Sequence, residues 1–459
     1  MASKTGVNVT ERGTPLPRFL IVAAVIVPVM VLFTIWGGVP EGQTTAFGIG
    51  IALLVAGVVG FLMLSWHLLY RPLPAGIKQP AIQPIPARAR QALAALLGVG
   101  ALAIVIGGFW DEVWHRLYSL PFGDDFFWRP HLLMYFGFLT VTLVGFGGLY
   151  LIAARGKGTF QQRFRANPLV GMLVLVALLL MVVLPADPIW HGIYGADLTA
   201  WSIPHQLLFV SFVMIMLVTT VIQLSLVPAR PWRSVLHVNG YDVLPILMSA
   251  AILMGPLQLF TTDWDQVDQI GFIREMRPDW VLMAITVAIA TFAGVVAVRS
   301  LRMVGAATLI GVLALGFRYV FIQVFEAQQV MSISAWVVAL PPLIALDVWL
   351  ARAGRRDRSR WWMEAAVMGA AGVLISMPLM GQLYPYLDAS ISALAVVGIG
   401  LAAVGAAWLG GQIGEGLATA PRQVEAERSG ARLMAIPVGA LAAMVAFMVF
   451  FISTATPPV

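Results

Sequence analysis

The chain has 459 residues, of which 60% are hydrophobic and only 11% are charged, and its formal net charge is +6. A soluble domain carries about 25% charged residues, so this composition excludes an ordinary soluble protein and predicts a membrane protein. The absence of cysteine excludes disulfides, thiolate metal sites, iron–sulfur clusters and thioether-attached haem.

Apolar runs of about 20 residues recur along the chain, and each is long enough to cross a bilayer as a helix. The predicted fold is therefore an all-α, polytopic membrane bundle of about 13 transmembrane helices. The first 17 residues are polar and lead into an apolar run without a small-residue cleavage site, so we expect the first helix to be retained. The predicted spans are 18–37, 45–70, 89–118, 127–153, 168–193, 203–227, 241–261, 279–298, 303–325, 330–351, 362–383, 388–411 and 434–454.

The basic residues fall on one side of these predicted spans. With a cytoplasmic N-terminus, 23 of the 28 Lys and Arg residues lie at cytoplasmic helix ends or in cytoplasmic loops. This distribution follows the positive-inside rule, so the positive net charge is explained by topology and needs no nucleic-acid partner. We expect the chain to lie in a prokaryotic cytoplasmic membrane, with its lipid bilayer as the surrounding partner.

Two stretches of the chain, 111–131 and 187–205, repeat one pattern of polar and aromatic residues. Each reads Asp-x-x-Trp-His-x-x-Tyr, then Gly, Asp and Trp, and ends in Pro-His. Four of the six histidines lie in these two copies. The predicted topology places both copies on the non-cytoplasmic face.

The spacing inside each copy predicts a three-ligand metal site on a helical hairpin. Aspartate and the first histidine are four residues apart, which places them on one face of a helix. The second histidine follows a proline at the start of the next span, where proline fits the first helical turn. Imidazole and carboxylate ligands suit copper, zinc or iron. The predicted metal ligands are Asp111, His115 and His131 in one site, and Asp187, His191 and His205 in the other.

Two further acids, Asp125 and Asp197, are expected to orient a ligating ring or to complete a site. The aromatic residues of both copies have a simpler interpretation, because Trp and Tyr are enriched at membrane interfaces. On that interpretation the aromatic residues are interfacial anchors. The residues concerned are Trp114, Tyr118, Trp128, Trp190, Tyr194 and Trp201.

The repeated pattern resembles the C subunit of the copper membrane monooxygenases, which include particulate methane, ammonia and short-chain hydrocarbon monooxygenases. In that subunit one helical hairpin carries Asp-x-x-x-His with a downstream His, and the next carries Asn-x-x-x-His with a downstream His. By this resemblance the two predicted ligand sets match the family's two copper triads, and Asp187 stands where the family has Asn. The resemblance covers predicted helices three to six.

The resemblance implies a function and a division of the chain. Residues 1–240 are expected to form a six-helix, C-subunit-like half with duplicated metal-site hairpins, and residues 241–459 a seven-helix half of unassigned role. The implied function is copper-dependent oxidation of a small apolar substrate by O₂, by an enzyme of the monooxygenase type. The implied partners are other membrane subunits and an extracytoplasmic cupredoxin-type subunit.

Two other classes of function stay open at this point. A permease for metal ions or small solutes would also place acids and histidines on the outer face, and a non-catalytic scaffold subunit would need none of them. A transporter should add polar residues within the membrane, where Arg318 and Glu326 are the candidates. We expect these two to form an ion pair, with a proton or substrate path as the alternative. His67 and His237 are predicted to be interface residues.

Overall fold

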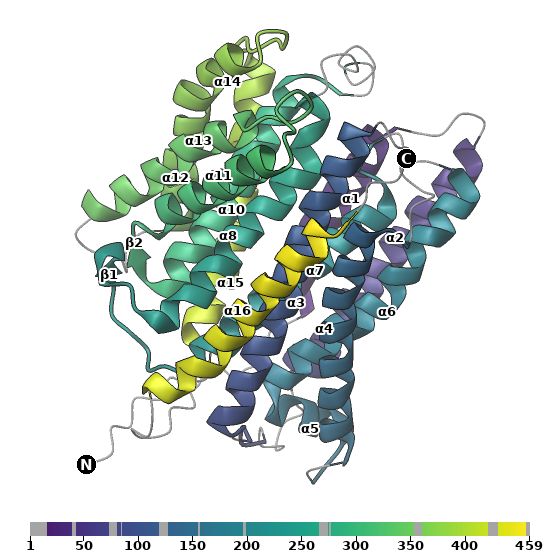
Figure 1. The fold of residues 1–459 in the computed structure, drawn as a ribbon, viewed down its shortest axis with the longest axis vertical. Coiled ribbons are helices and arrows are strands. Elements are labelled where there is room, and N and C mark those ends of the chain that lie inside the picture. Colours follow the sequence, from purple (N-terminus) through teal and green to yellow (C-terminus); the bar gives the residue numbers. More distant parts are fainter. Residues whose placement is uncertain are drawn as a thin grey trace.

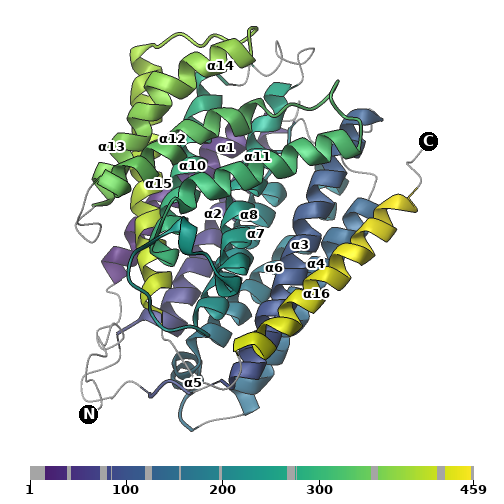
Figure 2. The same cartoon turned by 60° about the vertical axis from the view of Figure 1, so that its left-hand side comes forward.

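A computed structural model describes residues 16–38, 43–72, 80–83, 85–118, 127–154, 157–195, 199–265, 274, 277–352, 360–420 and 430–455. The fold is 83% helical with about 1% strand, which confirms the all-α prediction. Figures 1 and 2 show long helices lying side by side as one bundle.

The described residues of the first half form α1 (Leu16–Trp36), α2 (Thr44–Ser65), α3 (Ala87–Leu117), α4 (Arg129–Ala154), α5 (Phe160–Ala166), α6 (Pro168–Tyr194) and α7 (Ile203–Leu224). The second half supplies α8 (Gly240–Thr261), α10 (Trp280–Leu301), α11 (Ala306–Val324), α12 (Ser334–Arg352), α13 (Trp361–Ala371), α14 (Met377–Leu383), α15 (Ala393–Thr419) and α16 (Gly430–Ser453). Short π and 3₁₀ segments extend or join some of them: η1 (Trp66–Tyr70), η3 (Thr262–Asp265) and η6 (Gly372–Ser376). A further 3₁₀ turn, η2 (Val235–His237), precedes α8. Two short strands, β1 (Arg233–Ser234) and β2 (Met303–Val304), pair in parallel.

Eleven helices among the described residues are long and apolar enough to cross a membrane, and two shorter apolar helices cover Leu20–Trp36 and Ala442–Ser453. Each of the thirteen predicted spans overlaps one of these segments. The eleven long helices are consistent with an integral membrane protein.

The two predicted halves, 1–240 and 241–459, share one hydrophobic core. Its buried side chains come from α3, α4, α6 and α7 in the first half and from α8, α10, α11, α12, α13, α15 and α16 in the second. The last helix, α16, returns to pack along α3, as Figure 2 shows. The second half therefore contacts the helix that carries Asp111 and His115.

Glycines bring α3 and α4 into close contact. A Cβ atom at Gly137 of α4 would meet the carbonyl oxygen of Gly100 and would lie 2.7 Å from Ile104 Cγ1, both on α3. Small residues at such crossings let helix backbones approach and gain van der Waals contact. This close packing stabilises the α3–α4 hairpin, in which the end of α3 lies beside the first turn of α4.

Alanine in place of Gly137 is therefore expected to destabilise the protein by about 1–3 kcal/mol, because the added methyl group forces the two backbones apart. Thermal unfolding in detergent measures this loss. Gly147, on the same helix, provides the matched control, since a Cβ atom there meets nothing within 4 Å. Equal unfolding temperatures for both alanine variants would contradict the packing role of Gly137.

Candidate metal centre

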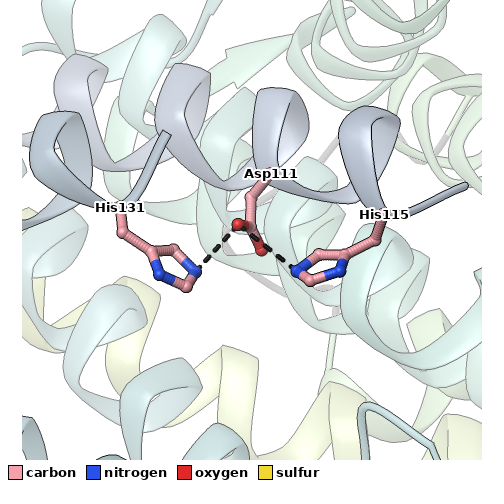
Figure 3. A group of neighbouring side chains, drawn as sticks. All are labelled: Asp111, His115 and His131. Carbon is pink, nitrogen blue, oxygen red and sulfur yellow. Dashed lines mark ion pairs between the residues drawn. The ribbon is translucent and has the colours of Figure 1, made fainter. Parts of the chain in front are cut away.

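The first predicted ligand set comes together at the α3–α4 hairpin (Figure 3). Asp111 and His115 lie one turn apart near the end of α3, and His131 lies in the first turn of α4, directly after Pro130. Asp111 Oδ1 is 2.8 Å from His131 Nε2 and 3.7 Å from His115 Nε2. The His115 side chain is only 2% exposed. One carboxylate and two imidazoles thus converge from two helices.

Trp128 contacts all three members of this first triad. Its Nε1 donates a hydrogen bond to Asp111 Oδ1 at 3.2 Å. Its ring centroid lies 4.7 Å from that of His115 and 5.6 Å from that of His131. The sequence pattern placed Trp128 among the interfacial anchors and gave no sign of these contacts. Hydrogen bonds of this kind orient ligating groups in metal sites.

Phenylalanine in place of Trp128 removes the hydrogen bond to Asp111 and keeps an aromatic ring. We expect the metal affinity of the first triad to fall about 10-fold, the lower end for loss of an outer partner of a ligand. Zinc titration of a chain whose second triad is disabled by His191→Ala measures this affinity. Trp362→Phe, at an exposed ring outside both triads, is the control. An unchanged affinity would show that Trp128 does not orient Asp111.

The second predicted ligand set converges in the same way where α6 ends and α7 begins. Asp187 Oδ1 is 3.6 Å from His191 Nε2 and 3.7 Å from His205 Nε2. One donor atom from each residue lies within 4.8 Å of the other two, as in the first triad. Among the described residues, these two triads are the groups of three or more His, Asp or Glu side chains that meet this criterion.

Hydrogen bonds at the far side of the rings orient the second triad. His191 Nδ1 lies 2.9 Å from the carbonyl oxygen of Gly195, and His205 Nδ1 lies 2.9 Å from Ser202 Oγ. A carbonyl oxygen only accepts, so His191 Nδ1 carries the proton, and in the neutral ring Nε2 presents a lone pair towards Asp187. Metal-ligating histidines are typically held by such bonds from the other ring nitrogen.

One carboxylate oxygen of Asp187, Oδ1, is buried without a hydrogen bond in the described part of the chain. A buried carboxylate oxygen without a partner is costly, and a bound cation would remove that cost. Ligands at about 2.1 Å from a metal lie about 2.9–3.4 Å apart, depending on the coordination angle. The separations of 3.6 and 3.7 Å are close to this range.

Several other predicted residues lie apart from these triads. Asp125 and Asp197 are outside the residues that the structure describes. His67 lies in η1, where its Nδ1 is 3.4 Å from the Arg71 guanidinium, and His237 ends η2. Neither joins a metal-ligand group within the described ranges.

Arg318 has different partners from those that the sequence predicted. Its guanidinium lies 3.4 Å from Glu112 Oε2 and 3.3 Å from Asp265 Oδ2, so the expected pair with Glu326 is wrong. Glu326 is exposed and follows the end of α11, at a φ of 53°. Because α11 ends at Val324, Glu326 lies beyond the helix that carries the buried Arg318 side chain.

A second buried arginine lies beside the connection that leads into the second triad. Arg277 stacks on Trp201 at 3.8 Å and on Trp264 at 4.7 Å, measured from Cζ to the ring centroid. It also pairs with Asp263 and donates to the carbonyl oxygen of Trp36. Sequence spacing made Trp201 the counterpart of Trp128, but the structure places Trp201 against Arg277.

Two tyrosines, Tyr384 and Tyr386, form hydrogen bonds with residues of η3. Burial and the charge of Asp265 raise the pKa of Tyr386 to about 12, and burial also raises the pKa of Tyr384. Tyr386 donates to the carbonyl oxygen of Trp264 at 2.8 Å. The contacts of both tyrosines therefore require the protonated phenol.

Stability is expected to fall as the pH rises from 10 towards 12, because the unfolded chain loses the Tyr386 proton first. One such group contributes at most about 1.4 kcal/mol per pH unit, and its contribution is complete below pH 10. Unfolding in detergent across this range should show a shallower decline for Tyr386→Phe than for the wild type. Tyr150→Phe, at an exposed tyrosine, should leave the decline unchanged. Identical slopes for all three proteins would contradict the assignment to Tyr386.

No family model, no curated protein and no solved structure matches this chain.

Proposed function

We propose that the chain is a membrane metalloprotein in which each triad holds one copper ion, and that it oxidises a small apolar substrate with O₂. One observation carries this proposal: a carboxylate oxygen and two imidazole nitrogens converge within 4.8 Å at two separate hairpins. The Asp187 Oδ1 atom supports it, because it accepts no hydrogen bond among the described residues and lies beside both imidazoles, where a cation would bind.

The donor set supports copper, with zinc and iron as the alternative metals. Imidazole and carboxylate ligands without sulfur favour Cu(II), Zn(II) or Fe(II) over Cu(I). The resemblance of the two triads to those of the copper membrane monooxygenases selects copper among these. Bound copper would supply the redox chemistry that activates O₂.

The protein's own residues have defined roles in this proposal. Asp111, His115 and His131 hold the first ion, and Asp187, His191 and His205 hold the second. Trp128 orients Asp111 and shields both histidine rings of the first triad from water. The exposed apolar side chains of the surrounding helices suit a substrate that reaches the site through the bilayer.

The proposal includes an orientation and partners. The positive-inside distribution of Lys and Arg supports thirteen spans, a cytoplasmic N-terminus and metal sites towards the non-cytoplasmic face of a prokaryotic membrane. An extracytoplasmic cupredoxin-type subunit and other membrane subunits are the proposed protein partners, as in the family that the triads resemble.

Oxidation of a short-chain alkane by membranes that contain the copper-loaded protein tests this function. With isotopically labelled O₂ and a quinol as reductant, we expect labelled alcohol from the wild type. His131→Ala and His205→Ala should abolish its formation, whereas His67→Ala and His237→Ala, outside both triads, should retain it. Copper uptake into proteoliposomes without any oxidation would instead support the permease.

A further inference from the structure

Arg318 of α11 lies at the centre of a buried polar cluster that joins the second half of the chain to α3. The side chain is 0% exposed. It donates to Gln258 Oε1 at 2.8 Å and to the carbonyl oxygen of Ser332 at 3.0 Å, in addition to its pairs with Glu112 and Asp265. Asp265 is itself fixed by Ser332 Oγ at 2.6 Å and by the Tyr384 hydroxyl at 3.0 Å.

The end of α3 carries two adjacent pairs of polar side chains. Asp111 and His115 face His131, while Glu112 and Arg116, one residue further along, form their own pair at 2.7 Å. Successive residues on a helix are about 100° apart, so the second pair lies beside the first. Any rotation of this end of α3 that breaks the Glu112–Arg318 contact also moves Asp111 and His115.

Aromatic packing holds the same turn from the same side. Phe109 packs edge-on against Phe317 and Phe321 of α11, with centroid distances of 5.0 and 5.7 Å. The Arg318 guanidinium lies over the Trp336 ring at 4.4 Å. The end of α3 is therefore fixed by both charge and packing from residues beyond 241.

In the part of the chain that the structure describes, the second triad has no counterpart to this arrangement. In the second copy of the pattern, Pro188 and Gly192 stand where the first copy has Glu112 and Arg116. Both are exposed, and their neighbours Ile189 and Ile193 are 59% and 56% exposed. A Cβ atom at Gly192 would meet nothing within 4 Å. Within the described residues, the exposed side of the last turn of α6 therefore lacks a contact like that of Glu112 with Arg318.

We infer that Arg318 is a positioning residue for the first triad alone: through Glu112 it fixes the rotation of α3 that brings Asp111 and His115 to His131. This inference rests on the proposed function for the statement that the triad holds metal. It also gives residues 241–459 a role, since Arg318, Gln258, Asp265 and Ser332 all belong to that half.

Arg318→Met and the milder Glu112→Gln test this inference in full-length protein with one triad intact. Zinc affinity of the first triad is measured in a His191→Ala background, and that of the second in a His115→Ala background. We expect the first affinity to fall about 10–100-fold in Arg318→Met, as for loss of outer partners of metal ligands, and the second to change less than about 2-fold. Arg318→Lys should restore part of the loss.

Arg299→Met is the matched control, because Arg299 is also buried in ion pairs, with Glu364 and Glu415.

Hydrogen–deuterium exchange of peptides 108–118 and 184–194 gives a second readout that needs no metal. Faster exchange only in 108–118 of Arg318→Met supports the inference. Unchanged exchange in peptide 108–118 of Arg318→Met overturns the inference. Equal losses of zinc affinity at both triads would indicate a general destabilisation and also overturn it. A wild type that binds no zinc or copper refutes the proposed function, and the exchange result then decides the positioning role by itself.

Discussion

Alanine in place of His131 is expected to lower the metal affinity of the first triad by about 100-fold or more and to leave the second triad unchanged. The reason is that structural metal sites gain about 10–16 kcal/mol from four ligands, so one ligand accounts for about 3 kcal/mol. His205→Ala should have the reverse effect. Equilibrium titration with copper or zinc measures both affinities and should resolve two independent sites in the wild type.

Two controls limit the interpretation of this result. His67→Ala changes a histidine that joins neither triad and should leave both affinities as they are. Asp187→Asn keeps the shape of the side chain and removes its charge, so it tests whether the buried Oδ1 serves the ion as a carboxylate. Full metal affinity in both His131→Ala and His205→Ala would contradict the assignment of the triads as ligands.

Methionine in place of Arg277 is expected to destabilise the protein by about 3–5 kcal/mol. Removing one partner of a buried ion pair leaves the other charge, here Asp263, without compensation, and the cation–π contacts with Trp201 and Trp264 are lost as well. Trp201 lies four residues before His205, so the affinity of the second triad should also fall while that of the first is retained.

Arg274→Gln is the matched control for Arg277→Met. Arg274 also pairs with an aspartate, Asp279, but its side chain is 43% exposed. An exposed pair contributes about 0–1 kcal/mol, so this change should barely move the unfolding transition. Chemical unfolding in mixed micelles compares the two variants. Equal losses of unfolding free energy in the two variants would show that the burial of Arg277 against Trp201 and Trp264 does not add to stability.

Much of the fold and of both triads follows from local features of the sequence. Apolar runs of helical length predict the long helices, and the four-residue spacing of Asp111 and His115 places them on one face. Pro130 and Pro204 fall at the second position of α4 and α7, where they bring the following histidine into the hairpin. Each of these predictions needs only neighbours in the chain.

The remaining features depend on contacts between distant segments, which the sequence does not specify. Arg318 and Glu112 are 206 residues apart, and nothing near Arg318 indicates that α11 lies beside α3. Trp128 and Trp201 look equivalent, but they precede the second histidine by three and four residues respectively. Both tryptophans lie in turns just before α4 and α7, and the structure places one ring on its triad and the other on Arg277.

The proposed metal sites are tested most directly by the metal content of the protein purified gently from cells supplied with copper. We expect two copper ions per chain, bound by nitrogen and oxygen with no sulfur neighbour in X-ray absorption. His131→Ala or His205→Ala should each retain one ion per chain. Zinc or iron at the same stoichiometry would keep the sites and remove the copper assignment, whereas a metal-free wild type would refute both metal sites.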